Sequence, residues 1–373
     1  MGPIRIFLAL VVVYDHLNNW VLRPNGLSLS GTAKLGMSGP TAVMFFYVIS
    51  GYLISLVLKA KYARTADGTR RFYTSRFVRI FSLYWPLYIF AMVFDIWQAR
   101  ETITGLLDVL TGALLLGSDW SVAFSSYPEL HFQALPNTLA VAWTLGAELT
   151  FYLLAPFLLR SKSASIAVLV ISFGLRIIIH ALVGFSNSWS YMFFPATIGF
   201  FLLGHFARVA YDRYAIPSIL GWGFLFLSII CSLPNRFIES WETPYFYSSV
   251  VLFALAVGGI AKGTARRGWL TKVGEISYPL YLVHPMLLYF LFLYSGPNAK
   301  TLINYVIDWS KRQNLDPANV VATLVILAAL ATATVVLYLV ERPAAQLMRR
   351  FIRTSARSPR AVGVSNQPLA APE

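Results

Sequence analysis

Ionisable side chains lie inside an apolar run over residues 1–22, where they are expensive to hold in a bilayer. Arg5 lies eleven residues before His16, about three helical turns, so the two side chains share nearly one face of a helix. A neutral imidazole on that face can take a proton from a hydroxyl near neutral pH, which is the chemistry of a general base. The neighbouring Asp15 argues against a removable signal peptide, and no small-residue cleavage site follows. We therefore expect Arg5 and His16 to face the protein interior as functional residues.

Arg76 and Arg79 stand three residues apart, so their side chains lie on one face of a helix. Two guanidinium forks at that spacing suit a phosphate-bearing ligand. The same pair is also expected where a helix enters the membrane from the cytoplasm, because Lys and Arg gather there and contact lipid headgroups. The spacing leaves both interpretations open.

Glu148 lies about midway through an apolar segment that we expect to span the membrane over residues 138–160. An unpaired carboxylate at that depth is costly, so it marks either a site or a buried ion pair. One alternative is a catalytic role. The other is a structural partnership with Arg5 or another buried cation.

Ser277, Tyr281 and His284 follow one another at i, i+4 and i+7, on one stripe of a helix. They can contact a substrate, although a lone His in a membrane helix can also bond a neighbouring carbonyl. No spacing of His, Cys, Asp or Glu in the sequence fits a metal site, and neither a phosphate-binding glycine-rich loop nor a nucleophile elbow occurs. Three further basic residues near predicted helix ends are expected to be interfacial or structural: Arg176, His180 and His205.

The composition places these residues in a membrane protein. Of the 373 residues, 57% are hydrophobic and 12% are charged, and the mean hydropathy is +0.63. A soluble domain carries about twice that charged fraction. The apolar residues gather in blocks of about twenty, the length that spans a bilayer as a helix. The net charge of +14 belongs in such a protein to cytoplasmic loops, so it does not indicate nucleic-acid binding.

The basic loops orient the predicted helices. The densest cluster of Lys and Arg near the first helices lies between residues 59 and 79, which places that loop and the N-terminus in the cytoplasm. Segment 103–117 is short for a span, and the loop 118–137 has no Lys or Arg, so we expect a re-entrant or outward-lying helix and then an extracytoplasmic loop. The sequence thus predicts an all-α polytopic membrane fold with about ten transmembrane helices, one short re-entrant or interfacial helix and both termini cytoplasmic. The spans are expected at 1–22, 39–58, 76–97, 138–160, 163–184, 191–210, 216–233, 244–262, 273–295 and 318–341.

The chain divides into two parts by composition. Residues 1–353 form the expected membrane domain. Residues 354–373 are rich in Ser, Pro, Ala and Arg, which predicts a disordered basic cytoplasmic tail. The sequence shows no internal repeat of the kind common in secondary transporters.

Taken in order, these motifs resemble the acyltransferase 3 family of integral-membrane O-acyltransferases. Arg5 and His16 resemble the Arg and His of its first helix, and Arg76 to Ile80 resembles its Arg-x-x-Arg motif. The segment 45–52, which contains Ser50, resembles its Phe-Phe-x-x-Ser-Gly. Asp15 has no counterpart in that pattern.

The second half of the chain continues the resemblance. Segment 143–156, with Trp143, Glu148 and Tyr152, resembles Trp-Ser-Leu-x-x-Glu-x-x-Phe-Tyr, with Thr where Ser is usual. Residues 276–284 resemble Ile-Ser-Tyr-x-x-Tyr-Leu-x-His, and residues 341–343 resemble the closing Glu-x-Pro. No extracytoplasmic esterase-like domain is expected after the last span, so the resemblance implies the stand-alone form of the family.

The resemblance implies transfer of an acyl group, most often acetyl from acetyl-CoA, to a hydroxyl of a carbohydrate or glycolipid acceptor. It implies a multi-pass protein of the bacterial inner membrane that binds no permanent cofactor or metal. His16 is then the general base, with Glu148 and Arg5 as further catalytic residues, and Arg76 and Arg79 bind coenzyme A phosphates. The residues expected to contact substrate or to support the site are Ser50, Trp143, Tyr152, Ser277, Tyr281 and His284.

Two alternatives remain open at the level of sequence. A covalent acyl-histidine intermediate would serve the same reaction as direct transfer. A proton-coupled transporter or flippase of a polar or lipid-linked substrate would also use buried ionisable residues, as a proton relay. The arginine pair and the lack of a visible repeat favour the enzyme.

Overall fold

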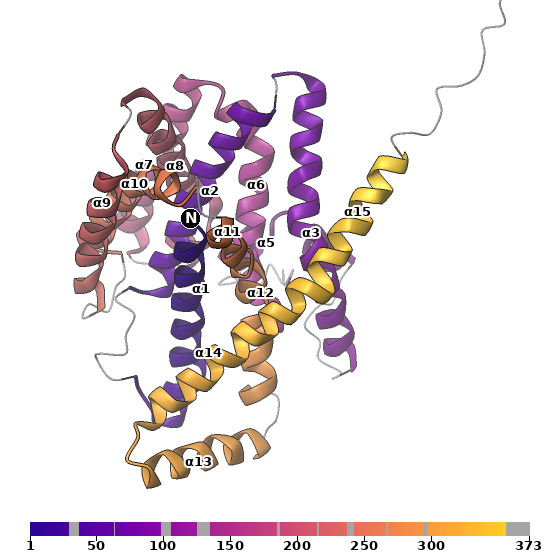
Figure 1. Ribbon diagram of the computed structural model, residues 1–373, viewed down its shortest axis with the longest axis vertical. Coiled ribbons are helices and arrows are strands. Elements are labelled where there is room, and N and C mark those ends of the chain that lie inside the picture. The colour runs from indigo at the N-terminus through magenta and orange to yellow at the C-terminus, as the bar shows by residue number, and fades with distance from the viewer. Residues whose placement is uncertain are drawn as a thin grey trace, which may run out of the picture.

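The computed structural model describes residues 1–29, 37–62, 64–97, 106–124, 135–184, 187–214, 216–236, 242–265, 268–293 and 297–355. Within these ranges all regular structure is helical and no β-strand occurs, as the sequence predicts. The helices pack into one bundle (Figure 1). They are α1 (Gly2–Leu17), α2 (Gly39–Lys61), α3 (Ala66–Trp97), α4 (Leu106–Leu114), α5 (Ser118–Phe124), α6 (Trp143–Leu158), α7 (Lys162–Val183), α8 (Phe194–Tyr214), α9 (Ser218–Ser232), α10 (Pro244–Ala265), α11 (Gly268–Glu275), α12 (Ser277–Leu288), α13 (Pro297–Arg312), α14 (Pro317–Val336) and α15 (Arg342–Ser355).

Among the described residues, six helical segments are long and apolar enough to cross a membrane, so the chain is a helical multi-pass membrane protein. The total of about ten spans and the cytoplasmic position of the termini stay predictions. The six segments are Gly39–Lys61, Ala66–Trp97, Thr138–Leu158, Lys162–Val183, Pro244–Thr264 and Pro317–Arg353.

Several helices differ in length from the predicted spans. Helix α3 begins at Ala66 rather than near residue 76, inside the basic segment that we assigned to a loop. The span expected at 273–295 is broken between α11 and α12, at Ile276. Hydropathy reports whether a segment tolerates lipid, and a helix can continue past that limit into water, so span prediction misplaces such ends.

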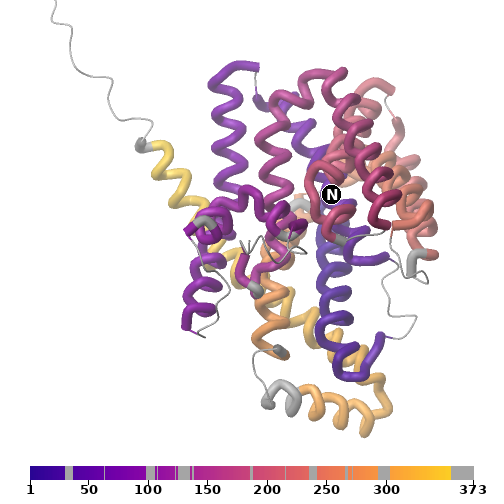
Figure 2. The backbone as a smooth tube through the Cα atoms, turned by 180° about the vertical axis from the view of Figure 1, so that it is seen from behind, coloured from indigo at the N-terminus to yellow at the C-terminus, as the bar shows by residue number. Residues whose placement is uncertain are grey.

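The last helical segment shows the same effect most clearly. Residues Pro317–Arg353 form one 37-residue run in which a π-turn (Leu337–Glu341) joins α14 to α15. At 1.5 Å per residue it is about 55 Å long, well beyond the roughly 30 Å of a hydrocarbon core. Both views show it crossing the bundle obliquely, with α15 projecting past α3 (Figures 1 and 2). Residues 354 and 355 of the predicted tail are the end of α15, and residues 356–373 lie outside the described residues.

The short segment before α6 folds as two short helices. Helix α4 has nine residues and rises about 14 Å, too little to cross a membrane, which agrees with the prediction for 103–117. Helix α5 occupies the first part of the loop 118–137. Residues 125–134 of that loop lie outside the described part of the chain, and its extracytoplasmic position stays a prediction.

Close contact between α2 and α8 holds the centre of the bundle. A Cβ on Gly51 would lie 1.8 Å from the carbonyl oxygen of Phe201, and a Cβ on Gly204 would lie 2.0 Å from that of Val48. Only glycine lets two helix backbones approach this closely, as small residues do at membrane helix interfaces. The crossing fixes α2, which carries Ser50 on another face toward α6.

Asp15 has a structural place in this packing. Its carboxylate lies against Gly39 at the first turn of α2, where an added Cβ would be 2.8 Å from Oδ2. Asn19, one turn further along, donates a hydrogen bond to the same oxygen at 3.3 Å. A negative charge is stabilised at a helix N-terminus by the free N–H groups there, so Asp15 helps to dock α2 on α1.

Candidate active site

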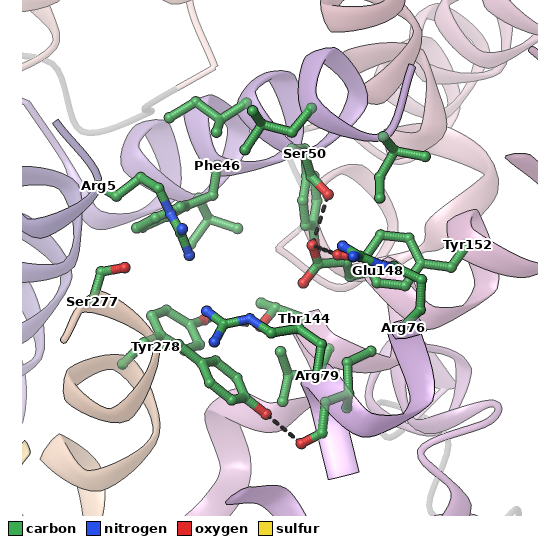
Figure 3. Close-up of a pocket in the computed structure, with 18 residues that line it drawn as sticks. Arg5, Phe46, Ser50, Arg76, Arg79, Thr144, Glu148, Tyr152, Ser277 and Tyr278 are labelled. Carbon is green, nitrogen blue, oxygen red and sulfur yellow. Dashed lines mark hydrogen bonds between the residues drawn. The ribbon is translucent and has the colours of Figure 1, made fainter. Parts of the chain in front are cut away.

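A cavity of about 150 Å³ lies between α1, α2, α3, α6 and α12, and we call it the arginine pocket. It gathers residues from five helices that are distant in sequence (Figure 3). Most of the predicted site residues line it. Its polar lining is Arg5, Tyr47, Ser50, Arg76, Arg79, Thr144, Glu148, Tyr152, Ser277, Tyr278 and Tyr281.

Glu148 is held by two hydroxyl groups. Ser50 on α2 donates a hydrogen bond to Oε1 at 2.6 Å, and Tyr152, one turn along α6, donates to the same oxygen (Figure 3). Among the described residues, no Lys or Arg forms an ion pair with Glu148. The structural partnership with a buried cation, one of the two alternatives, is thus not seen there. Both hydrogen bonds use Oε1, so Oε2 is available to a ligand in the pocket.

The two arginines of the Arg-x-x-Arg motif have different surroundings. Arg79 forms an ion pair with Glu341 at 2.8 Å, and its guanidinium lies 4.9 Å from the ring centroid of Tyr278. Arg76 lies over the rings of Phe72 and Tyr152 at about 6 Å, and among the described residues no carboxylate pairs with it. Arg76 is therefore the arginine that a bound anion can neutralise.

Arg5 reaches the pocket from α1 and points into the same open space as Arg79 (Figure 3). It interacts electrostatically with Arg79 and with Glu148 across the cavity. Within the described part of the chain, three guanidinium groups and one carboxylate thus line the pocket, and Glu341 pairs with Arg79 from outside the lining. The excess positive charge suits a polyanionic ligand. No cluster of His, Cys, Asp and Glu that could hold a metal ion occurs in the described ranges.

His16 does not line the arginine pocket, although Arg5 on the same helix does. Instead Nδ1 of His16 lies 2.8 Å from Nε2 of His284, and Trp20 stacks on the His16 ring at a centroid distance of 4.0 Å. Nδ1 of His284 lies 3.2 Å from the Leu280 carbonyl oxygen, which can only accept. With both rings neutral, His284 therefore donates to Leu280 and accepts from His16, which leaves Nε2 of His16 as a free base.

Tyr281 joins the two regions. It lines the arginine pocket, and its ring centroid is 5.9 Å from that of His284, one turn away on α12. Its hydroxyl makes a 3.0 Å hydrogen bond with Thr144 of α6. The stripe predicted on this helix thus extends from the pocket to the histidine pair, with Ser277 in the pocket lining.

Trp143 is placed apart from the other predicted residues. It is buried, contacts the edge of Tyr191 at a centroid distance of 5.0 Å and does not line the pocket. Conversely, three residues at the site have no role predicted from the sequence: Tyr278, Glu341 and Trp20. Two of them could have been found from the sequence, because Glu341 belongs to the closing Glu-x-Pro segment and Trp20 lies one helical turn after His16. For Tyr278 the sequence offers no indication beyond its place in the segment 276–284.

Comparisons with known proteins find one family match and several relatives. The family described as an acyltransferase domain matches residues 4–342, nearly the whole chain. Nodulation protein 10 of Rhizobium leguminosarum bv. viciae is 25% identical over 316 residues, which are 77% of this chain and 82% of that protein. No solved structure matches the chain.

Two longer relatives carry activity names. O-acetyltransferase OatA of Staphylococcus aureus is 26% identical over 339 residues, 83% of this chain and 53% of that protein. Peptidoglycan O-acetyltransferase OatA of Listeria monocytogenes is 24% identical over 327 residues, 75% of this chain and 48% of that protein. The chain spans about half the length of both OatA proteins.

Proposed function

The chain belongs to this acyltransferase family, and from that premise we propose that it moves an acyl group, acetyl by analogy with its relatives, from acyl-CoA to a hydroxyl of a carbohydrate or glycolipid acceptor. Two relatives are named O-acetyltransferases, and one of these names specifies peptidoglycan. We place the donor at the cytoplasmic side and the protein in the inner membrane of a bacterium. The observation that carries the proposal is a pocket with three arginines that adjoins a histidine pair.

The arginine pocket is the proposed site for coenzyme A phosphates. Arg76 has no carboxylate partner among the described residues, and Arg5 turns its guanidinium into the same cavity (Figure 3). Charge-assisted contacts of this kind are roughly twice as strong as neutral hydrogen bonds. Glu341 keeps Arg79 in place through their 2.8 Å ion pair. A donor anchored here would lie within the bundle with its phosphates toward these side chains.

The thioester then has to reach the histidine pair. Arg5 and His16 are eleven residues apart, about 16 Å along α1. The flexible pantetheine arm of coenzyme A suits such a separation between anchor and reacting bond. Tyr281, between the pocket and His284, lies along that path.

In the proposed reaction, Nε2 of His16 takes the proton of the acceptor hydroxyl as its oxygen attacks the thioester carbonyl. The carbon–sulfur bond breaks, the acyl group stays on the acceptor, and coenzyme A leaves as a thiolate that takes up the proton. His284 orients the His16 ring through the 2.8 Å contact. Glu148 and Arg5 would orient or stabilise the donor. The same residues also permit an acyl-histidine route, in which Nε2 is the nucleophile.

The test is acyl transfer by the purified protein in detergent, with radiolabelled acetyl-CoA and soluble peptidoglycan fragments or other glycan acceptors. Activity without any gradient separates the enzyme from a proton-coupled transporter. We expect His16→Ala to lower product formation by about 10²–10⁴-fold at equal protein level. His180→Ala, the same change at an exposed His on α7, is the matched control. Transfer by His16→Ala within about threefold of wild type would remove His16 from the chemistry.

A further inference from the structure

A second cavity, of about 530 Å³, lies where α2, α6 and α8 end, and we call it the basic cavity. Its size falls within the range of about 300–1,000 Å³ typical of small-molecule sites. Of the residues that the structure describes, five with cationic side chains line it, together with one carboxylate, that of Asp212. The cations are Lys59, Arg64, Arg160, Arg208 and Arg213. None of them has a part in the acyl-transfer mechanism above.

The wall of this cavity is built rather than left to mobile surface residues. The side chain of Arg208 is only 10% exposed, and its Nε donates to Ser55 at 2.7 Å. The Ser55 hydroxyl also lies 2.7 Å from Nδ1 of His205, so the serine accepts from the arginine and donates to the histidine. Asp212 pairs with both Arg208 and Lys59. These contacts hold one guanidinium in a fixed orientation at the cavity.

The charge of the cavity is not balanced by its own residues. Asp212 is shared by Lys59 and Arg208, and among the described residues the lining holds no second carboxylate for Arg64 or Arg213. Cations at helix C-termini complement the helix dipoles, and cations at a membrane surface attract lipid headgroups. Those effects explain basic residues on a surface, but they do not require a concave space with a buried arginine in its wall. A discrete phosphate-bearing ligand accounts for both features.

The position relative to the arginine pocket identifies such a ligand. Ile54 lines the arginine pocket and the next residue, Ser55, lines the basic cavity. Helix α6 borders both as well, with Tyr152 at the first and Arg160 just past its end at the second. From Ser50 to Lys59 the rise along α2 is about 14 Å. A single ligand with separate phosphate groups can therefore engage both sites.

We propose that the basic cavity binds the 3′-phosphorylated adenosine end of the acyl-CoA donor, while the arginine pocket takes the diphosphate and the start of the pantetheine arm. This inference rests on the proposed function, because it assigns a second subsite to the same donor. It predicts that the 3′-phosphate contributes to affinity through residues that are remote from the arginine pocket.

The experiment measures the dissociation constants of coenzyme A, dephospho-coenzyme A and adenosine 3′,5′-bisphosphate for the purified full chain in detergent. The test variant is Arg64→Gln with Arg213→Gln, two exposed cations whose loss leaves the Arg208 network intact. The control is Arg349→Gln with Arg353→Gln on α15, which removes the same charge elsewhere. We expect the test variant to bind coenzyme A and the bisphosphate about tenfold or more weakly, and dephospho-coenzyme A unchanged.

The outcomes separate the two proposals. Three results for the test variant would overturn the basic-cavity assignment. The first is an equal loss of affinity for coenzyme A and dephospho-coenzyme A, and the second is unchanged affinity for coenzyme A and the bisphosphate. The third is an equal loss of affinity in the α15 control. Wild-type protein that fails to bind the bisphosphate would do the same, even if acetyl transfer from acetyl-CoA is observed. If anionic phospholipid displaces the bisphosphate in wild type but coenzyme A does not, the cavity belongs to lipid headgroups and the inference is wrong. Absence of transfer from acetyl-CoA, by contrast, counts against the proposed function itself.

Discussion

The arginine pocket and the cluster around Arg176 both place guanidinium groups inside apolar helices, but only one of them leaves charge available. Arg176 is 1% exposed and forms an ion pair with Glu242 at 2.6 Å. It also donates to the carbonyl oxygens of Ser190 and Ala196 and to the hydroxyl of Tyr247. Each part of the fork thus has an acceptor. In the arginine pocket, Arg76 has no carboxylate partner within the described part of the chain and faces a cavity.

This difference separates a structural arginine from a binding arginine. A buried charge is tolerated when its partners are built into the fold, as around Arg176. A charge that lines a cavity without such partners can instead form an ion pair with a ligand of opposite charge. In the sequence, Arg176 and Arg76 both occur in or next to apolar segments and cannot be told apart in this way. Their roles follow from what other helices bring to them.

The largest effect is expected from breaking the Arg176 cluster. Arg176→Met leaves Glu242 buried and uncompensated, so we expect a loss of about 3–5 kcal/mol of stability. The measurement is thermal unfolding in detergent, together with coenzyme A affinity on the fraction that remains folded. The double variant Arg176→Met, Glu242→Gln should recover most of the lost stability, because it removes both charges. If coenzyme A affinity fell while the unfolding temperature stayed unchanged, Arg176 would be a binding arginine rather than a structural one.

Arg76→Ala should give the opposite pattern. Loss of one charge-assisted phosphate contact, roughly 1.5–3 kcal/mol, raises the dissociation constant of coenzyme A about tenfold to a hundredfold. The unfolding temperature should change little, because no ion pair within the described residues depends on Arg76. Arg76→Lys should recover only part of the affinity, since Lys keeps the charge but loses the planar fork.

Arg79 provides the internal control for that measurement. Arg79→Ala should lower both affinity and stability, because it strips Glu341, which is buried, of its partner. Adding Glu341→Gln should then restore stability but not affinity. If affinity returned as well, Arg79 would serve folding alone, as Arg176 does.

The smallest effect concerns the support of Glu148. Ser50→Ala removes the 2.6 Å hydrogen bond to Glu148 but leaves that of Tyr152. We therefore expect the activation free energy of acyl transfer to rise by about 0.5–1.5 kcal/mol. In activity this is a decrease of roughly threefold to tenfold, with coenzyme A affinity and stability near wild type. Thr150→Ala, which removes a hydroxyl that donates to the Gly146 carbonyl oxygen of α6, is the control. An equal decrease in both variants would mean that Ser50 contributes packing alone.

Much of the architecture follows from local patterns. Apolar blocks predict the helices, and the structure confirms the all-helical membrane class. Ser38 and Pro40 start α2 where the apolar run begins, since a capping hydroxyl and an early proline favour a helix N-terminus. The motif order identified the family, which the match over residues 4–342 confirms. Helix ends were less predictable, because α3 and α15 extend beyond any lipid-compatible stretch.

The sequence predicted most of the residues that belong to the candidate site, but not how they are arranged. Eight of the eleven predicted residues line the arginine pocket, so residue type and motif were sufficient to select them. Spacing on α1 predicted that Arg5 and His16 share a face that looks into the protein. The structure puts Arg5 in the pocket and His16 beside His284, because the long axis of a helix separates residues that share its face.

Local sequence patterns were sufficient to predict the helical class of the spanning segments, which residues share a face of each, and that basic and acidic groups lie within apolar surroundings. These properties depend on the 3.6-residue period and on the cost of charge in lipid, both of which act within one segment. Tertiary packing, by contrast, sets the hydrogen bond from Ser50 to Glu148, the pairing of Arg79 with Glu341 and the position of Arg76 at a cavity. Those choices depend on where helices cross, as at Gly51 and Gly204, where two backbones meet with no side chain between them.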